Sequence, residues 1–380
     1  MNFHFNQDEQ DVLDMLHDFC LKEVAPIAAE IDETERFPEE TWHKLADMGM
    51  MGIAYPEEVG GAGMSYVTYI GACEELAKHC ATTSVMVSAH SSLCCWPISE
   101  YGTEAQKEKY LSKLCSGEWL GAFGLTEPGA GTDAAMQKTV AEDKGDHWVL
   151  NGSKIFITNA GFANVFVVFA MTDKSLGTKG ISAFIVERDF PGFKVGSHEK
   201  KMGIRGSSTC ELVFEDCIVP KENLLGEVGK GFKIAMTTLD GGRIGIGAQA
   251  LGIAQAAIDE CVKYTKERVQ FGKRISQFQN TQFQLADMQA KLDGARLLIY
   301  RAAQAKQDHE PYSHLAAMGK LMASEVASDV TRRALQLVGG YGYTREYPVE
   351  RMMRDAKITE IYEGTSEVQR MVISGWMCVK

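Results

Sequence analysis

The segment HWVLNGSKIFITNAGFANVFVVFA, residues 147–170, carries the pattern that decides the fold. It contains short runs rich in β-branched and aromatic residues, separated by turn-forming residues, and two similar runs follow it. Runs of this length and composition are typical of β-strands. Their close spacing, without long helical patterns between them, favours an antiparallel sandwich or barrel over βαβ units. The five runs are His147–Leu150, Ser153–Thr158, Asn164–Ala170, Ile181–Glu187 and Cys210–Phe214.

On both sides of this region the hydrophobic period lengthens to that of helices. Before the strands, apolar residues recur every three to five positions: Val12, Leu16, Phe19, Val24, Ile27 and Ile31. After them, helical patterns run from 231 to 377, with breaks near 274–278, 310–311 and 339–348. We therefore predict a mainly α chain with a β insert. The predicted domains are an N-terminal helical domain (1–117), a middle antiparallel β domain (118–226) and a C-terminal helical bundle (227–380).

Composition and charge narrow the classes of function. Of 380 residues, 45% are hydrophobic and 24% charged, as in soluble globular proteins. The net charge of −12, from 39 basic and 51 acidic residues, argues against a nucleic-acid-binding face. The first residues lack an apolar signal segment and no apolar run would span a bilayer, so we expect a cytoplasmic protein.

Cysteine and histidine spacing gives no sign of a metal site. The ten cysteines include no C-x-x-C pair, and the nine histidines form neither H-x-x-x-H nor H-E-x-x-H. We expect reduced, mostly buried thiols and no bound metal.

Two G-x-G-x-x-A matches, at 129–134 and 245–250, suggest a Rossmann dinucleotide site. That fingerprint requires a strand, a turn and a long helix in this order. The first match has no long helix after it, and the second lies inside a helical pattern. We therefore read both as chance matches, and any dinucleotide must be held in another way.

Four segments remain as candidates for chemistry, each with a plainer alternative. Thr126–Asp133 could direct N–H and hydroxyl donors at a ligand, or be an ordinary hairpin loop. Glu363, between an Ile-Tyr pair and a glycine, could be a general base with a raised pKa, or belong to a solvated charged face. Gln336–Tyr343 could approach a phosphate or flavin, or simply stop a helix. Arg268–Lys273 could clamp an anion, or be an exposed turn.

Taken in order, several segments identify a family. They are LTEPGAGTD (125–133), NGSKIFITNAG (151–161), MGIRGSST (202–209), ERVQFGK (267–273), QLVGGYGYTREYP (336–348) and RDAKITEIYEGTSE (354–367). Together they resemble the acyl-CoA dehydrogenase family, with spacing closest to its bacterial short-chain (butyryl-CoA) members. The resemblance implies an N-terminal helical domain, a middle β domain and a C-terminal four-helix bundle. It also implies FAD as the cofactor, bound without a Rossmann unit.

The resemblance assigns binding roles to individual residues. Residues of the β domain would line the flavin: Phe123, Leu125, Thr126, Thr132, Phe156, Ile157 and Thr158. A partner subunit would contribute Arg268, Phe271, Gln279, Gln336, Leu337, Val338, Gly339 and Gly340. Thr365, Ser366 and Glu367 would close over FAD. The acyl-CoA substrate would contact Thr132, Asp240, Arg243 and Gly364. Phe156 stands where many relatives have tryptophan.

The resemblance makes Glu363 the catalytic base of an α,β-dehydrogenation to trans-2-enoyl-CoA. Glu363 would remove the α proton while the β hydrogen leaves as hydride to flavin N5. The Glu363 backbone N–H and a ribityl hydroxyl of FAD would stabilise the enolate-like transition state. Some relatives carry the base just before the arginine at 243, but that place reads Asp240-Gly241-Gly242 here. Electrons would pass to an electron-transfer flavoprotein, and the protein would be a homotetramer, a dimer of dimers.

Alternatives remain open at this point. Branched, alicyclic or arylpropanoyl-CoA thioesters are candidate substrates, and the enzyme could work as an enoyl-CoA reductase. A flavin oxidase on the same fold, with oxygen as acceptor, belongs to another class. A catalytically silent relative is disfavoured because Glu363 is present.

Overall fold

Helices form the N-terminal region in the computed structural model, which describes residues 5–378. Asn6 begins α1 with a capping box, since its side chain accepts from Glu9 N–H and the Glu9 carboxylate accepts from Asn6 N–H. Leu16, Val24 and Ile31 of the predicted apolar face are buried. The helices are α1 (Gln7–Phe19), α2 (Ala28–Thr34), α3 (Glu39–Asp47), α4 (Tyr66–His79), α5 (Ala81–Ser88), α6 (Trp96–Tyr101), α7 (Glu104–Gln106) and α8 (Ser112–Cys115), with π-helical turns at Cys20–Val24, Ala89–Cys95 and Lys107–Leu111.

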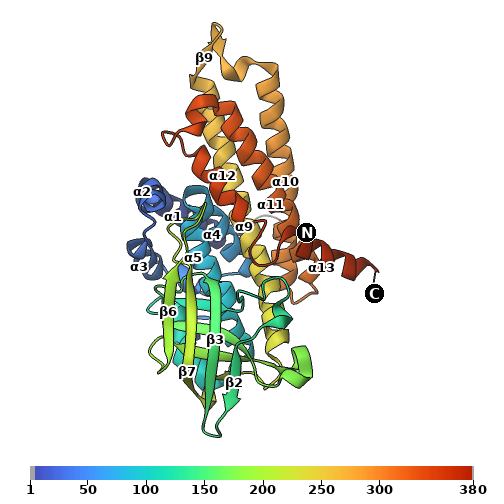
Figure 1. Cartoon of the computed structure of the whole chain (residues 1–380). Coiled ribbons are helices and arrows are strands. Elements are labelled where there is room, and N and C mark those ends of the chain that lie inside the picture. Colours follow the sequence, from blue (N-terminus) through green and yellow to red (C-terminus); the bar gives the residue numbers. More distant parts are fainter. Residues whose placement is uncertain (1–4, 379–380) are drawn as a thin grey trace.

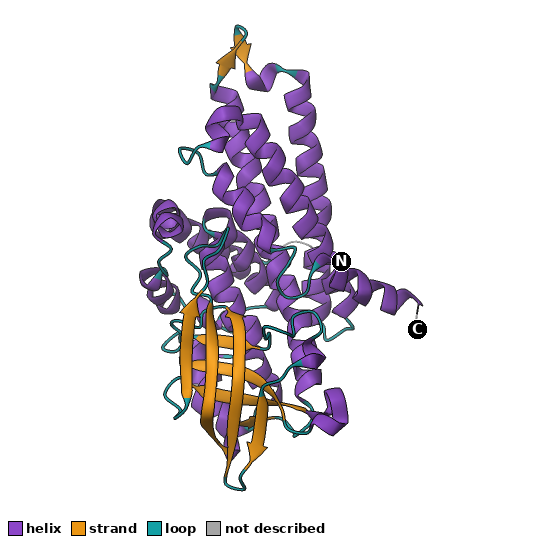
Figure 2. Cartoon of the chain, in the orientation of Figure 1, coloured by secondary structure: helices purple, strands orange, loops and turns teal. Residues whose placement is uncertain are grey.

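The middle region is one eight-stranded sheet, with the order β6-β7-β3-β2-β4-β5-β8 and with β1 paired to β4. Figure 2 shows these strands as one block at one end of the helices. Most pairs are antiparallel, as predicted, but β1 runs parallel to β4, and β2 touches β4 in parallel at one position. The strands are β1 (Gly121–Gly124), β2 (Val140–Asp143), β3 (His147–Ile157), β4 (Val165–Met171), β5 (Ile181–Glu187), β6 (Phe193–His198), β7 (Cys210–Pro220) and β8 (Leu224–Leu225).

Two predicted strand runs form a single strand. β3 passes through the expected turn at Gly152, where the pairing with β7 shifts register. A β-carbon at Gly152 would lie 2.6 Å from Thr139 Oγ1, so this glycine lets the strand pass close to its neighbour. β1, β2, β6 and β8 were not predicted from the sequence.

Long helices follow the sheet. Three of their breaks fall at or next to the predicted positions, whereas the break at 359–365, between α12 and α13, was not predicted. α11 packs against both α9 and α10, and the three stand side by side in Figure 1. The hairpin of β9 and β10 lies at the end of this bundle away from the sheet (Figure 1). The elements are α9 (Gly231–Glu267), β9 (Val269–Gln270), β10 (Lys273–Arg274), α10 (Gln279–Gln307), α11 (Ser313–Val338), α12 (Val349–Ile358) and α13 (Ser366–Cys378).

The architecture confirms the predicted fold class of helices, a β region and helices. Residues 245–250 lie inside α9, and 129–134 lead only into a short helical turn at Ala134–Met136, so neither glycine motif has the Rossmann context. The limits at 117/118 and 226/227 stay predictions, and residues 1–4 and 379–380 of the outer domains lie outside the described part.

The cysteines are free thiols, and most of them are buried. All ten cysteines, which lie within the described part, are unpaired; nine are buried and Cys378 is exposed. No helix between residues 5 and 378 has both the length and the apolar character needed to cross a membrane.

Candidate active site

The turn between α12 and α13 presents Glu363 to the interior. Glu363 and Gly364 both have left-handed backbones, with φ of +53° and +95°. Oε2 of Glu363 is buried and has no hydrogen-bond partner among the described residues. Burial raises the pKa of Glu363 to about 7, and the positive charges of Lys320 and Arg243 oppose that rise. The structure thus holds a buried carboxylate whose pKa is raised above its ordinary value.

Gly242 on α9 makes room for this carboxylate. A β-carbon built at Gly242 would come well inside 3.0 Å of Glu363 Oε2 and 2.8 Å from Leu93 Cδ2. Real β-carbons almost never come that close to other atoms. Glycine at 242 therefore lets the carboxylate lie directly against the helix.

Three neighbouring helices hold the turn. The Tyr362 hydroxyl donates to Gln249 Oε1 on α9, and Gln249 Nε2 donates to the carbonyl of Ala81 on α5 at 2.8 Å. Lys320 Nζ on α11 donates to the carbonyls of Tyr362 and Gly364. Neither Gln249 nor Lys320 was predicted from the sequence to take part in the site. The one sign in the sequence that could have identified them is a polar residue within an apolar stretch of a predicted helix.

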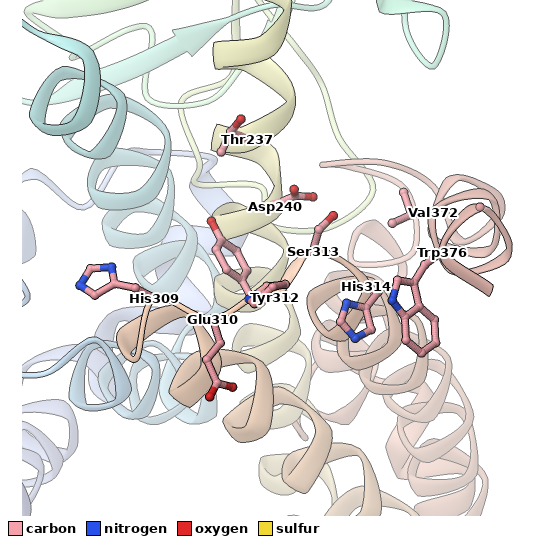
Figure 3. A pocket seen from close by; sticks show the side chains of 11 residues that line it. Thr237, Asp240, His309, Glu310, Tyr312, Ser313, His314, Val372 and Trp376 are labelled. Atoms are coloured by element: carbon pink, nitrogen blue, oxygen red, sulfur yellow. The ribbon is translucent and has the colours of Figure 1, made fainter. Parts of the chain in front are cut away.

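Asp240 and Arg243, the predicted substrate residues on α9, form an ion pair one turn apart. Burial raises the pKa of Asp240, and Arg243 opposes this. Asp240 also lines a cavity of about 630 Å³ between α9, the loop before α11 and α13 (Figure 3). Figure 3 shows Tyr312, Ser313 and Asp240 on one side of it and Trp376 on the other. Glu363 does not line this cavity, which opens beside the Asp240–Arg243 pair.

The predicted flavin residues of the β domain lie where the loop after β1 meets β3. Ile155 N–H donates to the Thr126 carbonyl at 2.9 Å, so Leu125 and Thr126 lie beside the end of β3. Phe156, with φ of +60°, exposes 59% of its surface. Leu125 and Ile157 are buried, whereas Thr132 is exposed. β-Carbons at Gly129 and Gly131 would meet nothing within 4 Å, so the backbone of this loop is open to a ligand.

A buried ion pair fixes that loop. Lys154 Nζ lies 2.8 Å from Glu127 Oε1 and also donates to the carbonyl of Leu125 and to Gln137. Glu127 accepts the N–H groups of Lys138 and Thr139 as well. These contacts tie the loop to β3 and to the segment just before β2.

The residues predicted to serve a partner subunit lie at the far end of the bundle. The Arg268 guanidinium lies 5.5 Å from the centre of the Tyr341 ring, which places the hairpin beside the glycine turn at 339–340. Phe271 exposes 94% of its surface. β-Carbons at Gly339 and Gly340 would meet nothing within 4 Å. Figure 1 shows this hairpin and the sheet at opposite ends of the molecule, so the two groups of predicted flavin residues lie apart within a single chain.

The remaining predicted contacts differ in exposure. Gln279 and Gln336 are exposed, and Leu337 is partly buried. Val338 is 3% exposed inside the bundle, so it offers little surface to a ligand in a single chain. Thr365, Ser366 and Glu367 follow Gly364 directly at the start of α13. The Ser366 hydroxyl is buried without a partner among the described residues, and Glu367 is exposed.

Among residues 5–378, one cluster could accept a metal ion, although no metal site was predicted. Ligand atoms of His17, Glu75 and His79 lie within 4.8 Å of one another, between α1 and α4. The Glu75 carboxylate is already engaged by both imidazoles and by Lys78. Its hydrogen bonds outweigh burial and lower its pKa to about 2. This arrangement suits an ion-pair network between the two helices.

Family models match nearly the whole chain: acyl-CoA dehydrogenase N-terminal domain at 6–118, middle domain at 122–217 and C-terminal domain at 229–378. The chain belongs to the acyl-CoA dehydrogenase family. This membership confirms the resemblance seen in the sequence and makes the protein an oxidoreductase.

Individual relatives are similar over their full lengths. The short-chain specific acyl-CoA dehydrogenase of Clostridium acetobutylicum is 60% identical over 375 residues, 99% of each chain. The structure of butyryl-CoA dehydrogenase from Megasphaera elsdenii matches with a TM-score of 0.98 and 54% identity, covering 99% of this chain and 100% of that one. A chain in the structure of the electron transferring flavoprotein of Acidaminococcus fermentans matches with a TM-score of 0.99 and 54% identity, covering 100% of both.

Proposed function

We propose that this protein is an FAD-dependent dehydrogenase of short acyl-CoA thioesters such as butyryl-CoA, with trans-2-enoyl-CoA as product. The observation that carries the proposal is the Glu363 carboxylate, whose buried Oε2 has no partner among the described residues and lies against Gly242. A base with a pKa near 7 is suited to remove a proton at neutral pH. The similarity to short-chain specific and butyryl-CoA enzymes supports the choice of substrate.

In this proposal Glu363 takes the α proton of the thioester, and the β hydrogen departs with its electron pair, so the product gains a C=C bond. When bound, FAD supplies the acceptor for that hydride at N5. The backbone N–H of Glu363 would donate to the thioester oxygen as negative charge develops there. Asp240 and Arg243 would orient the CoA portion at the entrance.

The surface chemistry fits an extended flavin dinucleotide. An open glycine loop and the exposed Phe156 ring lie at the edge of the sheet. A second open glycine turn, a guanidinium and the exposed Phe271 lie at the far end of the bundle. Backbone N–H groups and arginine suit phosphates, and aromatic rings suit a planar ring system. Homotetramer assembly would unite the two sets from neighbouring subunits.

We further propose an electron-transfer flavoprotein as the electron acceptor. A similar chain occurs in a structure of such a flavoprotein, and this supports the proposal. A cytoplasmic location stays a prediction.

The decisive experiment is anaerobic flavin bleaching with a panel of acyl-CoAs of different length and branching. We expect fastest bleaching with butyryl-CoA, and FAD as the yellow cofactor released on denaturation. Glu363→Gln should keep FAD and bind acyl-CoA but lose nearly all bleaching. Near-normal bleaching in that variant would refute the assignment of the base, and rapid reoxidation by air would favour an oxidase.

A further inference from the structure

Lys320 is a lysine in an unusual place. It lies in the first third of α11, flanked by buried alanines at 316, 317 and 323, and none of its surface is exposed. Burying an ammonium group is unfavourable unless hydrogen bonds and opposite charge compensate. Helix packing alone therefore does not explain why a lysine is buried at this position.

Its hydrogen bonds go to the turn that carries Glu363. Lys320 Nζ donates to the Tyr362 carbonyl at 2.7 Å and to the Gly364 carbonyl. These two carbonyls lie on either side of Glu363. Gln369 Nε2 on α13 also donates to the Gly364 carbonyl, at 2.8 Å. The lysine thus bridges the peptide before Glu363 and the peptide after Gly364.

The two hydrogen bonds from Lys320 affect the direction of both the Glu363 side chain and the Glu363 backbone N–H. A left-handed backbone at a non-glycine residue persists only where the surroundings impose it, and it sets the direction in which the side chain leaves the turn. The Tyr362 carbonyl and the Glu363 N–H belong to one planar trans peptide and point in opposite directions. Fixing that carbonyl toward α11 therefore fixes the N–H on the side away from α11.

The charges around Glu363 single out Lys320. Lys320 from α11 and Arg243 from α9 are the cations that act on Glu363, and Tyr66 and Cys73 from α4 and the adjacent Tyr362 are its uncharged titratable neighbours. Arg243 is already paired with Asp240. Glu360 also acts on Lys320 but forms its own pair with Lys357.

Of the two carboxylates in the described part of the chain that act on Lys320, Glu363 is therefore the one without an ion-pair partner of its own. Burial lowers the pKa of Lys320 to about 7, the region in which Glu363 titrates, so the two groups share their protonation equilibrium.

We infer that Lys320 is a positioning residue for the reaction, which holds the 362–364 turn so that the Glu363 carboxylate and the Glu363 N–H both face the thioester, and whose charge favours the ionised base. This role rests on the proposed function. It requires no contact between Lys320 and substrate.

Two substitutions separate the hydrogen bonds from the charge. Lys320→Met removes both while keeping an unbranched side chain that is one atom shorter, and Lys320→Gln removes the charge but keeps an N–H donor. The control is Lys291→Met on α10, an exposed lysine paired only with Asp329. For each purified holoenzyme, FAD content, affinity for trans-2-butenoyl-CoA and the rate of anaerobic flavin bleaching by butyryl-CoA would be measured from pH 5.5 to 9.

In Lys320→Met we expect FAD content and trans-2-butenoyl-CoA affinity close to those of the parent. The bleaching rate should fall by about 100-fold, the effect of a misplaced catalytic group. The midpoint of the pH profile should move upward by about one unit, since a neighbouring cation favours the carboxylate. Lys320→Gln should recover part of the rate but keep the shifted midpoint.

An unchanged rate per bound FAD with an unchanged midpoint in either variant would overturn the inference, whatever happens to thermal stability. If Lys320→Met does not fold, the midpoint in Lys320→Gln decides alone. Failure of the proposed function would look different: Glu363→Gln would still bleach.

Discussion

The carboxylate of Glu363 occupies the space that a side chain on Gly242 would need. One residue lies in the turn before α13 and the other lies 121 positions earlier on α9, yet the two are in contact across the interior. The Glu363 carboxylate can lie this close to the α9 backbone because residue 242 has no β-carbon.

Gly242→Ala should displace the carboxylate and slow flavin reduction by about 100-fold, because a shift of about 1 Å in a reacting group has effects of that size. FAD should remain bound. Anaerobic stopped-flow reduction by butyryl-CoA measures the rate. Gly294→Ala on α10 is the matched control, since its β-carbon would meet nothing within 4 Å. A normal rate in Gly242→Ala would contradict the placement of the base.

The rate of flavin reduction should rise with pH between about 6 and 8. The ionised carboxylate is the active base, and the pKa of Glu363 is about 7. At lower pH a smaller fraction of the carboxylate is ionised, and the rate should be lower in proportion. Single-turnover bleaching at saturating substrate measures this step, and its midpoint belongs to the coupled Glu363–Lys320 pair. A profile that is flat or falling over this range would count against Glu363.

Phe271→Ala should weaken retention of FAD and association of subunits without unfolding the chain. The Phe271 ring is 94% exposed in a single chain, so its loss costs nothing in the core. Covering such a ring in an assembly is worth roughly 1.5–3 kcal/mol, or about a 10- to 100-fold change in affinity. Gel filtration with light scattering, followed by flavin absorbance, measures both effects. Leu176→Ala, at a 56% exposed position of the β domain, is the control, and equal FAD retention in the two variants would refute the partner contact.

Lys154→Met should destabilise the protein by roughly 3–5 kcal/mol, because it leaves the Glu127 carboxylate buried without its cation. The double variant with Glu127→Gln should recover part of that loss. Lys194→Met breaks an exposed pair with Glu215 and should cost less than about 1 kcal/mol. Thermal unfolding of the three variants measures the order of their stabilities. Equal melting temperatures for Lys154→Met and Lys194→Met would show that the buried pair is unimportant.

Local patterns in the sequence were enough to predict the layout of the fold. Strands such as β4 and β5 are continuous apolar runs bounded by turn residues, and both were predicted to within one residue at either end. The helix breaks at 310–311 and 339–348 also follow from proline and glycine chemistry. The short strand β1 was missed because its pairing with β4, 44 residues later, is not a local property.

The candidate site depends more on contacts that are distant in sequence. Glu363 was identified from its neighbours and from family resemblance, but its burial could not be separated from a solvated charged face by composition alone. Gly241 and Gly242 are poor helix formers inside α9. Glycine is needed at these two positions because the side chains of Lys306 and Glu363 fill the space that a β-carbon would take. Lys320 has an ordinary propensity for helix, and only the folded chain shows that it is buried beneath the turn at 362–364.

The hairpin at the tip of the bundle has a consequence for how the enzyme behaves on dilution. If its arginine and phenylalanine complete the flavin site of a neighbouring copy, a lone subunit holds two incomplete halves and no whole site. Cofactor loading and subunit association would then be thermodynamically linked, so each would strengthen the other. Specific activity should fall as the enzyme is diluted, and added FAD should restore it by drawing the subunits back together.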